Sequence, residues 1–312
     1  MRIAVIGAGG VGGFLGALLS RAGHDVTFLA RGPHLAAIRE QGLEIKSAQF
    51  GNFTVRPAAT DNAAELGRND LVLLAVKMYD FENACEAAKT ALAPNGVAVP
   101  IQNGLDAPDL LAAVVGRERA LVGSASIEAA ITAPGTVGHM VPTHWLTLAE
   151  LNGPPGERVR HLEAMLQQAE ITVKVAADGR QALWDKAGLL IPFATLTAAA
   201  DCGLGEMWGV PSLQKVWTEL RDEAIAVAAA DGYDVRESIA TTVATFVKML
   251  PAASAFTSSM NRDFRSGKRS ELEWLTGKLI RLADEKNVPV PAHDALYGVL
   301  NLKAQRQAQA GK

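Results

Sequence analysis

Cysteine and surplus positive charge are both scarce in this chain of 312 residues. The only cysteines, Cys85 and Cys202, are far apart and lack metal-ligand spacing, so the sequence supports neither a disulfide framework nor a zinc site. Lysine and arginine together number 30 against 33 acidic residues, and a formal net charge of −3 leaves no basic footprint for nucleic acid. We therefore expect a small molecule as the partner.

Long apolar runs are also absent. The most apolar later segment, residues 187–200, contains Pro192 and two threonines and falls short of the ~20 residues that a membrane-spanning helix needs. The first residues lack the apolar region and small-residue cleavage site of a secretory signal. We expect a cytoplasmic protein with no membrane role, which fits the sparse cysteines.

Hydrophobic residues make up 49% of the chain, and its length exceeds the usual size of one domain. Buried-strand and helix patterns alternate in the first half, whereas amphipathic helical segments dominate the second. The predicted fold class is α/β, with an N-terminal Rossmann-type dinucleotide-binding domain over residues 1–176 and an all-helical C-terminal domain over residues 177–312.

The expected elements of the first domain follow hydrophobic periodicity and turn signals. We expect strands at 2–6, 25–29, 71–76 and 97–101, several strands within 120–151, and a strand at 171–175 that closes the sheet. We expect a hairpin over 43–57 that turns near Gly51-Asn52, and helices at 11–22, 33–41, 81–92, 109–115 and 156–168. In the second domain we expect helices at 181–200, 212–231, 235–250, 271–286 and 292–307.

A glycine-rich turn, Gly7-Ala8-Gly9-Gly10-Val11-Gly12, joins the first strand to the first helix. Gly7, Gly9 and Gly12 lack a Cβ that would obstruct a sharp turn, the approach of a pyrophosphate, or close packing of helix on sheet. The helix N-terminus offers N–H groups to phosphates, so Gly10 joins the predicted cofactor site. Because a second strand follows, this context favours a dinucleotide site over a purely structural turn.

The second strand ends in Ala30-Arg31, without the acidic residue that accepts the ribose 2′-OH of NAD. A guanidinium can pair with the 2′-phosphate of NADPH, and His34 and Arg39 lie close enough in sequence to add positive potential. NADPH is therefore the predicted cofactor. The alternative is that Arg31 is only a solvated loop arginine.

Two further strands place polar residues at their carboxyl ends. Lys77 follows the strand at 71–76, and Gln102-Asn103-Gly104 follows the strand at 97–101. Ligands of open α/β sheets bind at this edge, so Lys77 and Asn103 are predicted beside the glycine turn. For Lys77, position alone fits an exposed loop lysine equally well.

In the second half, Lys186 lies in the segment 182–187, which starts a helix whose following turns are almost entirely apolar. It shares overlapping faces with Leu183, Leu190 and Ala194. A lysine beside an apolar wall can have a lowered pKa and donate a proton. Taken alone, the pattern favours a lysine that extends its ammonium group to solvent.

Several motifs along the chain, taken together, favour the proton-donor interpretation of Lys186 instead. They are the glycine turn, Val76-Lys77, Gln102-Asn103-Gly104, L-W-x-K at 183–186, Ser258-Ser259-Met260-x-x-Asp263 and Ser270-Glu271-x-x-x-Leu275-x-Gly277. With these motifs nearly the whole chain resembles the ketopantoate reductases (2-dehydropantoate 2-reductases) of pantothenate biosynthesis, which reduce a 2-oxo acid with NADPH.

The resemblance implies roles for individual residues. Lys186 would protonate the carbonyl oxygen as hydride reaches C2, and Glu271 would position and tune that lysine. Such a partner fits the chemistry, because reducing a ketone creates an alkoxide. The other implied contacts are Asn103 with nicotinamide and substrate, Ser259 with the substrate carboxylate, and Arg31 and Lys77 with NADPH.

The chain departs from the family pattern where asparagines usually hold the substrate's polar groups. It has Leu190, Ala194 and Leu204 there, and Phe256 where an asparagine is common. A buried ketopantoate hydroxyl without partners would cost roughly 1–3 kcal/mol. Two alternatives to ketopantoate reduction stay open. One is a dehydrogenase for branched or aromatic 2-oxo acids, and the other is a non-catalytic NADP-binding protein whose second domain serves sensing or homodimer formation.

Overall fold

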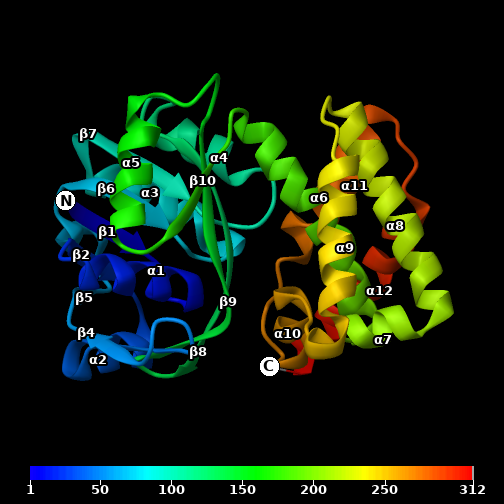
Figure 1. Ribbon diagram of the computed structural model, residues 1–312, viewed down its shortest axis with the longest axis horizontal. Helices are drawn as coiled ribbons and strands as arrows, with labels where there is room; N and C mark the ends of the chain where they lie inside the picture. Colours follow the sequence, from blue (N-terminus) through cyan, green and yellow to red (C-terminus); the bar gives the residue numbers. More distant parts are fainter. Residues whose placement is uncertain (311–312) are drawn as a thin grey trace. The chain divides into compact units, whose positions relative to one another are not determined.

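The computed structural model describes residues 1–310, and its contacts divide the chain into two units, Met1–Gly179 and the part from Arg180 onward (Figure 1). The predicted boundary at residue 176 lies just before this division. No helix in the described part of the chain is long and apolar enough to cross a membrane.

Unit 1 is built on a parallel five-stranded sheet with the strand order β5-β2-β1-β6-β7. Its strands are β1 (Arg2–Ile6), β2 (Asp25–Leu29), β5 (Ala58–Thr60), β6 (Asn69–Leu74) and β7 (Leu92–Pro100). Its helices are α1 (Gly10–Arg21), α2 (Gly32–Gln41), α3 (Phe81–Ala91) and α4 (Ala107–Val115), with the 3-10 turns η1 (Ala63–Leu66) and η2 (Met78–Asp80). The central strands β1 and β6 are buried on both faces, which explains their continuous apolar runs.

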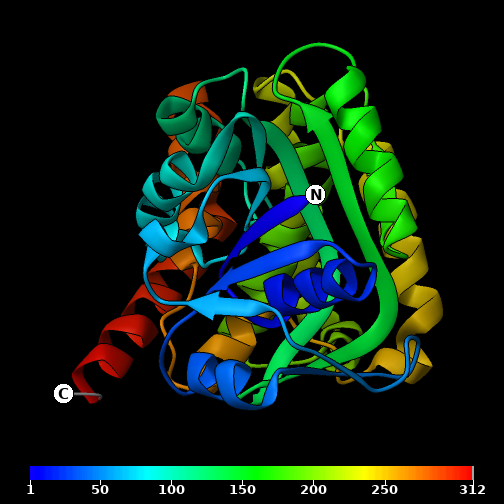
Figure 2. The same cartoon turned by 90° about the vertical axis from the view of Figure 1, so that its left-hand side faces the viewer.

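A second sheet, with the order β10-β9-β3-β4, lies in the same unit. It contains β3 (Leu43–Ser47), β4 (Phe53–Val55), β8 (Leu121–Ala133), β9 (Thr136–Glu150) and β10 (Thr172–Val175), with helix α5 (Glu157–Gln168) between the last two. The long strands β8 and β9 pair antiparallel and run past α1, which packs on both (the green strands and blue helix in Figure 2).

Two predictions about these strands had different outcomes. The hairpin predicted at 43–57 forms as β3 and β4. The strand predicted at 171–175 was expected to close the single sheet, and this was wrong: β10 pairs in parallel with β9 in the second sheet. Periodicity identifies a strand but not its partner, and the three-residue strand β5 was too short to predict.

The second unit is helical throughout the described residues 180–310, as predicted. It comprises α6 (Gly179–Ala200), α7 (Leu204–Gly209), α8 (Pro211–Ala230), α9 (Arg236–Ala253), α10 (Ser259–Arg265), η3 (Leu272–Trp274), α11 (Thr276–Lys286) and α12 (Pro291–Ala310). Helix α8 packs on α7, α11 and α12. The short helices α7 and α10 were not predicted, because each spans too few residues to show a helical period.

A buried polar contact joins two of these helices. Glu223 of α8 accepts hydrogen bonds from the N–H groups of Ala292 and His293, and from Nδ1 of His293 at 2.7 Å. It thereby caps the N-terminus of α12, where a negative charge is favoured. Burial opposes ionisation of Glu223, but these hydrogen bonds outweigh it and lower its pKa.

Candidate active site

The glycine turn has the geometry that its spacing predicts. Gly7 has φ of +103°, a conformation that side chains disfavour, and its N–H donates to the carbonyl of Leu29 at the end of β2. A Cβ on Gly12 would lie 2.0 Å from the carbonyl oxygen of Gly7. Gly12 therefore lets α1 start directly against β1.

Gly9 and Gly10 differ in what surrounds them. Among the described residues, a Cβ on Gly9 would meet nothing within 4 Å, whereas a Cβ on Gly10 would lie 2.0 Å from the carbonyl oxygen of Ala129 in β8. Gly9 thus faces open space, whereas Gly10 packs on β8. Any contact of Gly10 with a cofactor would be through its backbone atoms. The first turn of α1 carries no acidic residue. This open N-terminus fits the pyrophosphate of a dinucleotide.

Arg31 follows β2 as the N-cap of α2, and its side chain is 76% exposed. Its Nη2 donates to Oδ2 of Asp80 at 2.6 Å. Asp80 ends η2, the turn that follows β6, so the residues after β2 in the sequence give no sign of an acidic group near Arg31. The structure brings one there.

The expectation that His34 adds positive potential beside Arg31 was wrong. Nδ1 of His34 accepts the N–H of Gly135, so Nε2 carries the proton and donates to the carbonyl of Ala8. Burial lowers the pKa of His34, in agreement with a neutral ring. His34 instead ties the glycine turn to the loop between β8 and β9.

The carboxyl ends of β1, β6 and β7 meet at one edge, as predicted. A Cβ on Gly7 would lie 3.0 Å from backbone atoms of Ala75 and from the side chain of Val76. Lys77 and Asn103, which continue β6 and β7, are both half-buried. The residues predicted to contact the cofactor therefore all follow strands at the carboxyl edge of this parallel sheet, with Arg31 two residues after the neighbouring strand β2.

Gln102 links two of these strand ends and was not singled out from the sequence. Its side chain is 6% exposed, and Nε2 donates to the carbonyls of Leu74 at 2.9 Å and Val76 at 3.0 Å. The buried Oε1 has no hydrogen-bond partner among the residues that the structure describes. A polar residue that follows a buried strand was the available signal, but it did not distinguish Gln102 from Asn103.

The second unit carries the predicted catalytic residues. Lys186 and Leu190 lie four residues apart on α6 and are half-buried, whereas Glu271 is 6% exposed at the start of η3. Ala194 and Leu204 are 1% and 0% exposed, so both belong to the core. Of the apolar substitutions on α6, only Leu190 keeps a surface that a substrate could touch.

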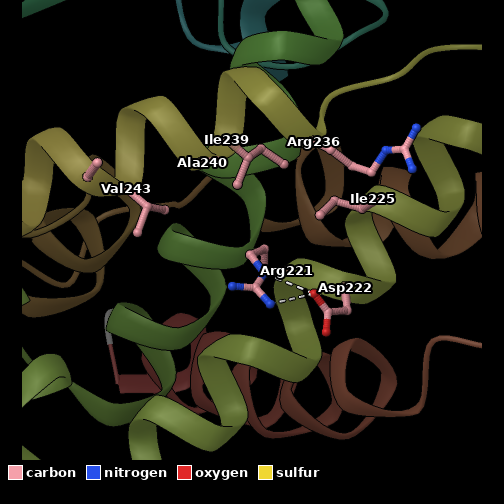
Figure 3. A pocket seen from close by; sticks show the side chains of 8 residues that line it. Arg221, Asp222, Ile225, Arg236, Ile239, Ala240 and Val243 are labelled. Atoms are coloured by element: carbon pink, nitrogen blue, oxygen red, sulfur yellow. Dashed lines mark hydrogen bonds and ion pairs between the residues drawn. The ribbon is translucent and has the colours of Figure 1, made fainter.

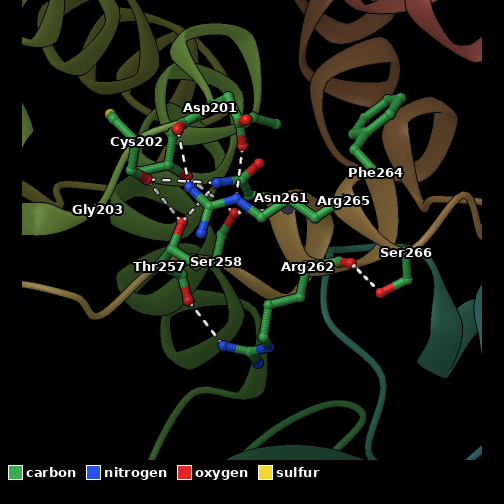
Figure 4. Close-up of polar contacts among 12 residues, drawn as sticks. Asp201, Cys202, Gly203, Thr257, Ser258, Asn261, Arg262, Phe264, Arg265 and Ser266 are labelled. Carbon is green, nitrogen blue, oxygen red and sulfur yellow. Dashed lines mark hydrogen bonds and ion pairs between the residues drawn. The ribbon is translucent and has the colours of Figure 1, made fainter.

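Two pairs of hydroxyls hold α6 to neighbouring elements. Thr195 lies 2.7 Å from Thr276 of α11, and Thr197 lies 2.9 Å from Ser258, the N-cap of α10. Ser258 also accepts the N–H of Asn261 within the polar network of Figure 4. Ser259, the first residue of α10, is half-buried beside this network.

Phe193 of α6 forms a cluster with two other phenylalanines. Phe193 stacks on Phe256 with ring centres 5.7 Å apart and planes at 14°, and Phe246 of α9 lies within 6.1 Å of both rings. Phe256, which stands where the family commonly has an asparagine, therefore forms part of an aromatic contact.

A surface pocket of about 380 Å³ between α8 and α9 contains none of the predicted residues (Figure 3). Its two arginines, Arg221 and Arg236, already pair with Asp222 and Asp234. The candidate site is thus not this pocket.

A parallel sheet, an open glycine turn and an arginine after the second strand define the class, a dinucleotide-binding protein with a Rossmann-type unit. Comparison with known proteins gives the family. The model described as ketopantoate reductase PanE/ApbA matches residues 3–153, and its C-terminal counterpart matches residues 178–304. The chain belongs to the ketopantoate reductase family.

Individual relatives agree with this assignment. The chain is 30% identical to the uncharacterized oxidoreductase YkpB of Bacillus subtilis, over 97% of this chain and 98% of YkpB. It is 29% identical to a 2-dehydropantoate 2-reductase of Halobacterium salinarum, over 98% and 99% of the two chains. These oxidoreductases set aside the hypothesis of a non-catalytic NADP-binding protein.

Solved structures share the fold over the full length. A PanE/ApbA family ketopantoate reductase from Ralstonia eutropha superposes with a TM-score of 0.90, at 28% identity over 99% of this chain and 100% of that one. D-mandelate dehydrogenase with NADH and anilino(oxo)acetate gives the same TM-score, 0.90, over 99% and 100% of the chains. Its 19% identity shows the fold alone.

Proposed function

We propose that this protein reduces a 2-oxo acid to a 2-hydroxy acid with NADPH, and that ketopantoate, reduced to pantoate, is its substrate. The observation that carries the proposal is the match of both family models, which together span the glycine turn, Lys186 and Glu271. NADPH when bound supplies the hydride. Gly9 and the N-terminus of α1 would bind its pyrophosphate, and Arg31 and Lys77 its other phosphate and ribose groups.

In the proposed chemistry, Lys186 donates a proton to the substrate's carbonyl oxygen as C2 gains hydride. The ammonium group also stabilises the alkoxide charge that develops there. Glu271 keeps Lys186 positioned and charged, Asn103 contacts nicotinamide and substrate, and Ser259 binds the substrate carboxylate. The buried position of Glu271 supports a positioning role, because burial restricts a side chain's conformers.

The test of catalysis separates chemistry from cofactor binding. Lys186→Ala is expected to lower kcat by about 10²- to 10⁴-fold, as for loss of a general acid, while the Kd for NADPH stays within twofold. Lys215→Ala, at an exposed lysine of α8, is the matched control and is expected to change neither quantity. Full activity of Lys186→Ala would contradict the assigned proton donor.

A second candidate substrate class, branched or aromatic 2-oxo acids, is favoured by one observation. Leu190 follows Lys186 by one helical turn and presents an apolar side chain where the family typically has an asparagine. Specificity constants with NADPH should be compared for ketopantoate, 2-oxoisocaproate and phenylpyruvate. A higher constant for phenylpyruvate than for ketopantoate would reject ketopantoate as the substrate.

The variant Leu190→Asn addresses the same question. If ketopantoate is the substrate, an amide there can pair with its hydroxyl, and kcat/KM for ketopantoate should rise by about 5- to 150-fold, the equivalent of 1–3 kcal/mol. Ala194→Asn is the contrasting variant, because Ala194 is 1% exposed. It should lower stability without improving ketopantoate reduction.

A further inference from the structure

An acidic residue from a distant part of the sequence lies against Arg31. Oδ2 of Asp80 is 2.6 Å from Nη2 of Arg31, and the two side chains are 31% and 76% exposed. The end of β2, where dinucleotide-binding units contact the adenosine ribose, therefore carries a positive and a negative group in direct contact. Arg31 alone would predict a clear preference for a 2′-phosphate.

The two groups have opposite effects on a 2′-phosphate. The guanidinium carries five N–H donors, so a phosphate can bind another of its edges while Asp80 stays in place. Exposed ion pairs contribute little to stability, so Arg31 can also exchange Asp80 for the phosphate at small cost. In either case the Asp80 carboxylate stays near a group of charge about −1.5 to −2 and repels it.

NADH places a hydroxyl at the same position. A carboxylate at this strand end accepts a hydrogen bond from the ribose 2′-OH in NAD-binding domains. Asp80 brings that chemical group to the end of β2 from η2 rather than from β2 itself. One ion pair thus offers a partner to each of the two cofactors.

We propose that the Arg31–Asp80 pair sets the choice between NADPH and NADH, with Asp80 restraining the NADPH preference that Arg31 confers. The inference rests on the proposed dinucleotide site. Two charges of −1 and −2 that stand about 6 Å apart in water repel by an amount equivalent to roughly tenfold in Kd. The native protein is expected to bind both cofactors with a modest preference for NADPH.

The test measures binding without turnover. Kd values of the purified full chain are determined by calorimetry for NADPH, NADH, 2′,5′-ADP and 5′-AMP. Asp80→Asn keeps the size and a hydrogen-bonding group but removes the charge, and it should tighten NADPH and 2′,5′-ADP by about tenfold. NADH and 5′-AMP should bind equally or more weakly. Arg31→Ala should weaken NADPH and 2′,5′-ADP far more than NADH.

Another ion pair supplies the matched control. Asp234 of the second unit pairs with its neighbour Arg236 at 2.5 Å and is 62% exposed, so Asp234→Asn removes the same charge without touching any residue assigned to the cofactor. Its NADPH/NADH ratio should stay within twofold of the native value. Because screening weakens exposed charges, the Asp80→Asn effect should shrink at 0.5 M salt.

Two results would overturn the role of Asp80. An unchanged NADPH/NADH ratio in Asp80→Asn would show that its charge does not act on the 2′-phosphate. Weaker NADPH binding would show that Asp80 holds Arg31 in place for the phosphate instead. If the native chain binds neither dinucleotide, the proposed function fails first, whereas native binding and activity with an unchanged ratio reject only this inference.

Discussion

Single alanine substitutions in the glycine turn should separate folding from cofactor binding. Gly9, Gly10 and Gly12 belong to one motif, yet an added methyl meets open space at Gly9, the backbone of Ala129 at Gly10, and the carbonyl of Gly7 at Gly12. The same chemical change therefore has three different physical consequences. Sequence spacing alone would assign all three glycines to the cofactor.

For Gly9→Ala the stability terms nearly cancel. Gly9 is the N-cap of α1 with φ −66° and ψ −167°, which alanine can adopt. Alanine is a poorer N-cap than glycine by about 0.5–1 kcal/mol, while its smaller unfolded-state entropy returns about 0.4–1 kcal/mol. The midpoint of thermal unfolding should therefore shift by only about 1 °C at most. The methyl would occupy the side from which a pyrophosphate approaches, so the Kd for NADPH should rise at least tenfold, a loss of about 1.4 kcal/mol.

For Gly12→Ala the order of effects reverses. The new Cβ would stand 2.0 Å from the oxygen of Gly7 and 2.7 Å from the Cβ of Ala75, so α1 must move away from β1. Overpacking of this kind costs about 1–3 kcal/mol, and a rigid backbone partner places the expected cost near 3 kcal/mol. Gly10→Ala should destabilise similarly through Ala129.

The assay is thermal unfolding of each variant without cofactor, followed by titration with NADPH. Gly9→Ala should unfold like the native chain but bind weakly, whereas Gly12→Ala and Gly10→Ala should unfold at temperatures roughly 5 °C lower. NADPH binding by Gly9→Ala within twofold of the native value would refute the assignment of Gly9 to the pyrophosphate. Native stability in Gly12→Ala would refute the steric argument.

Three further predictions concern buried polar groups. Gln102→Met removes two hydrogen bonds to carbonyls but also the unpartnered Oε1, so unfolding measurements should show a loss of about 1–2 kcal/mol, with a several-fold weaker Kd for NADPH. The pKa of Glu223 is lower in the folded state than in the unfolded state, so the folded state binds fewer protons. The stabilisation that ionised Glu223 provides is therefore complete above its ordinary pKa of 4.5 and is lost as the pH falls below that value. Native unfolding midpoints should therefore fall more steeply below pH 5 than those of Glu223→Gln, which keeps a partner for His293; parallel curves would contradict this. Thr197→Val should cost about 1–2 kcal/mol by breaking the bond to Ser258, whereas Thr245→Val, an exposed hydroxyl bonded only within α9, should cost under about 0.5 kcal/mol.

Local signals predicted most of the elements, because periodicity and glycine turns act over a few residues. The strands β1, β2 and β6 and the five long helices of the second unit follow from them. The split into two sheets does not, because the partner of β10 is the distant strand β9. No periodic pattern in the sequence encodes which strand β10 pairs with, because that depends on where the long β8–β9 hairpin lies in the folded unit.

The site was predictable to the same extent. Positions where the backbone conformation requires a glycine, such as Gly7 with its positive φ, could be assigned from motif spacing. Residues whose role depends on contacts with distant parts of the chain could not be assigned in this way. Asp80 reaches Arg31 from 49 residues away, and His34 is neutral because it binds Ala8 and Gly135 instead of adding charge. Each changes the electrostatics that the sequence suggested around the cofactor.

The absence of asparagines at positions 190, 194, 204 and 256 carries less information about the substrate than their number suggests. Ala194 and Leu204 are enclosed in the core, so their apolar character satisfies packing inside the unit. A buried asparagine at either position would need its own hydrogen-bond partners. Phe256 is half-buried and stacks on Phe193, so an aromatic contact accounts for part of its surface. Leu190 is also half-buried and lies one turn beyond Lys186. The departures that bear on the choice between ketopantoate and a more apolar 2-oxo acid are therefore Leu190 and, in part, Phe256.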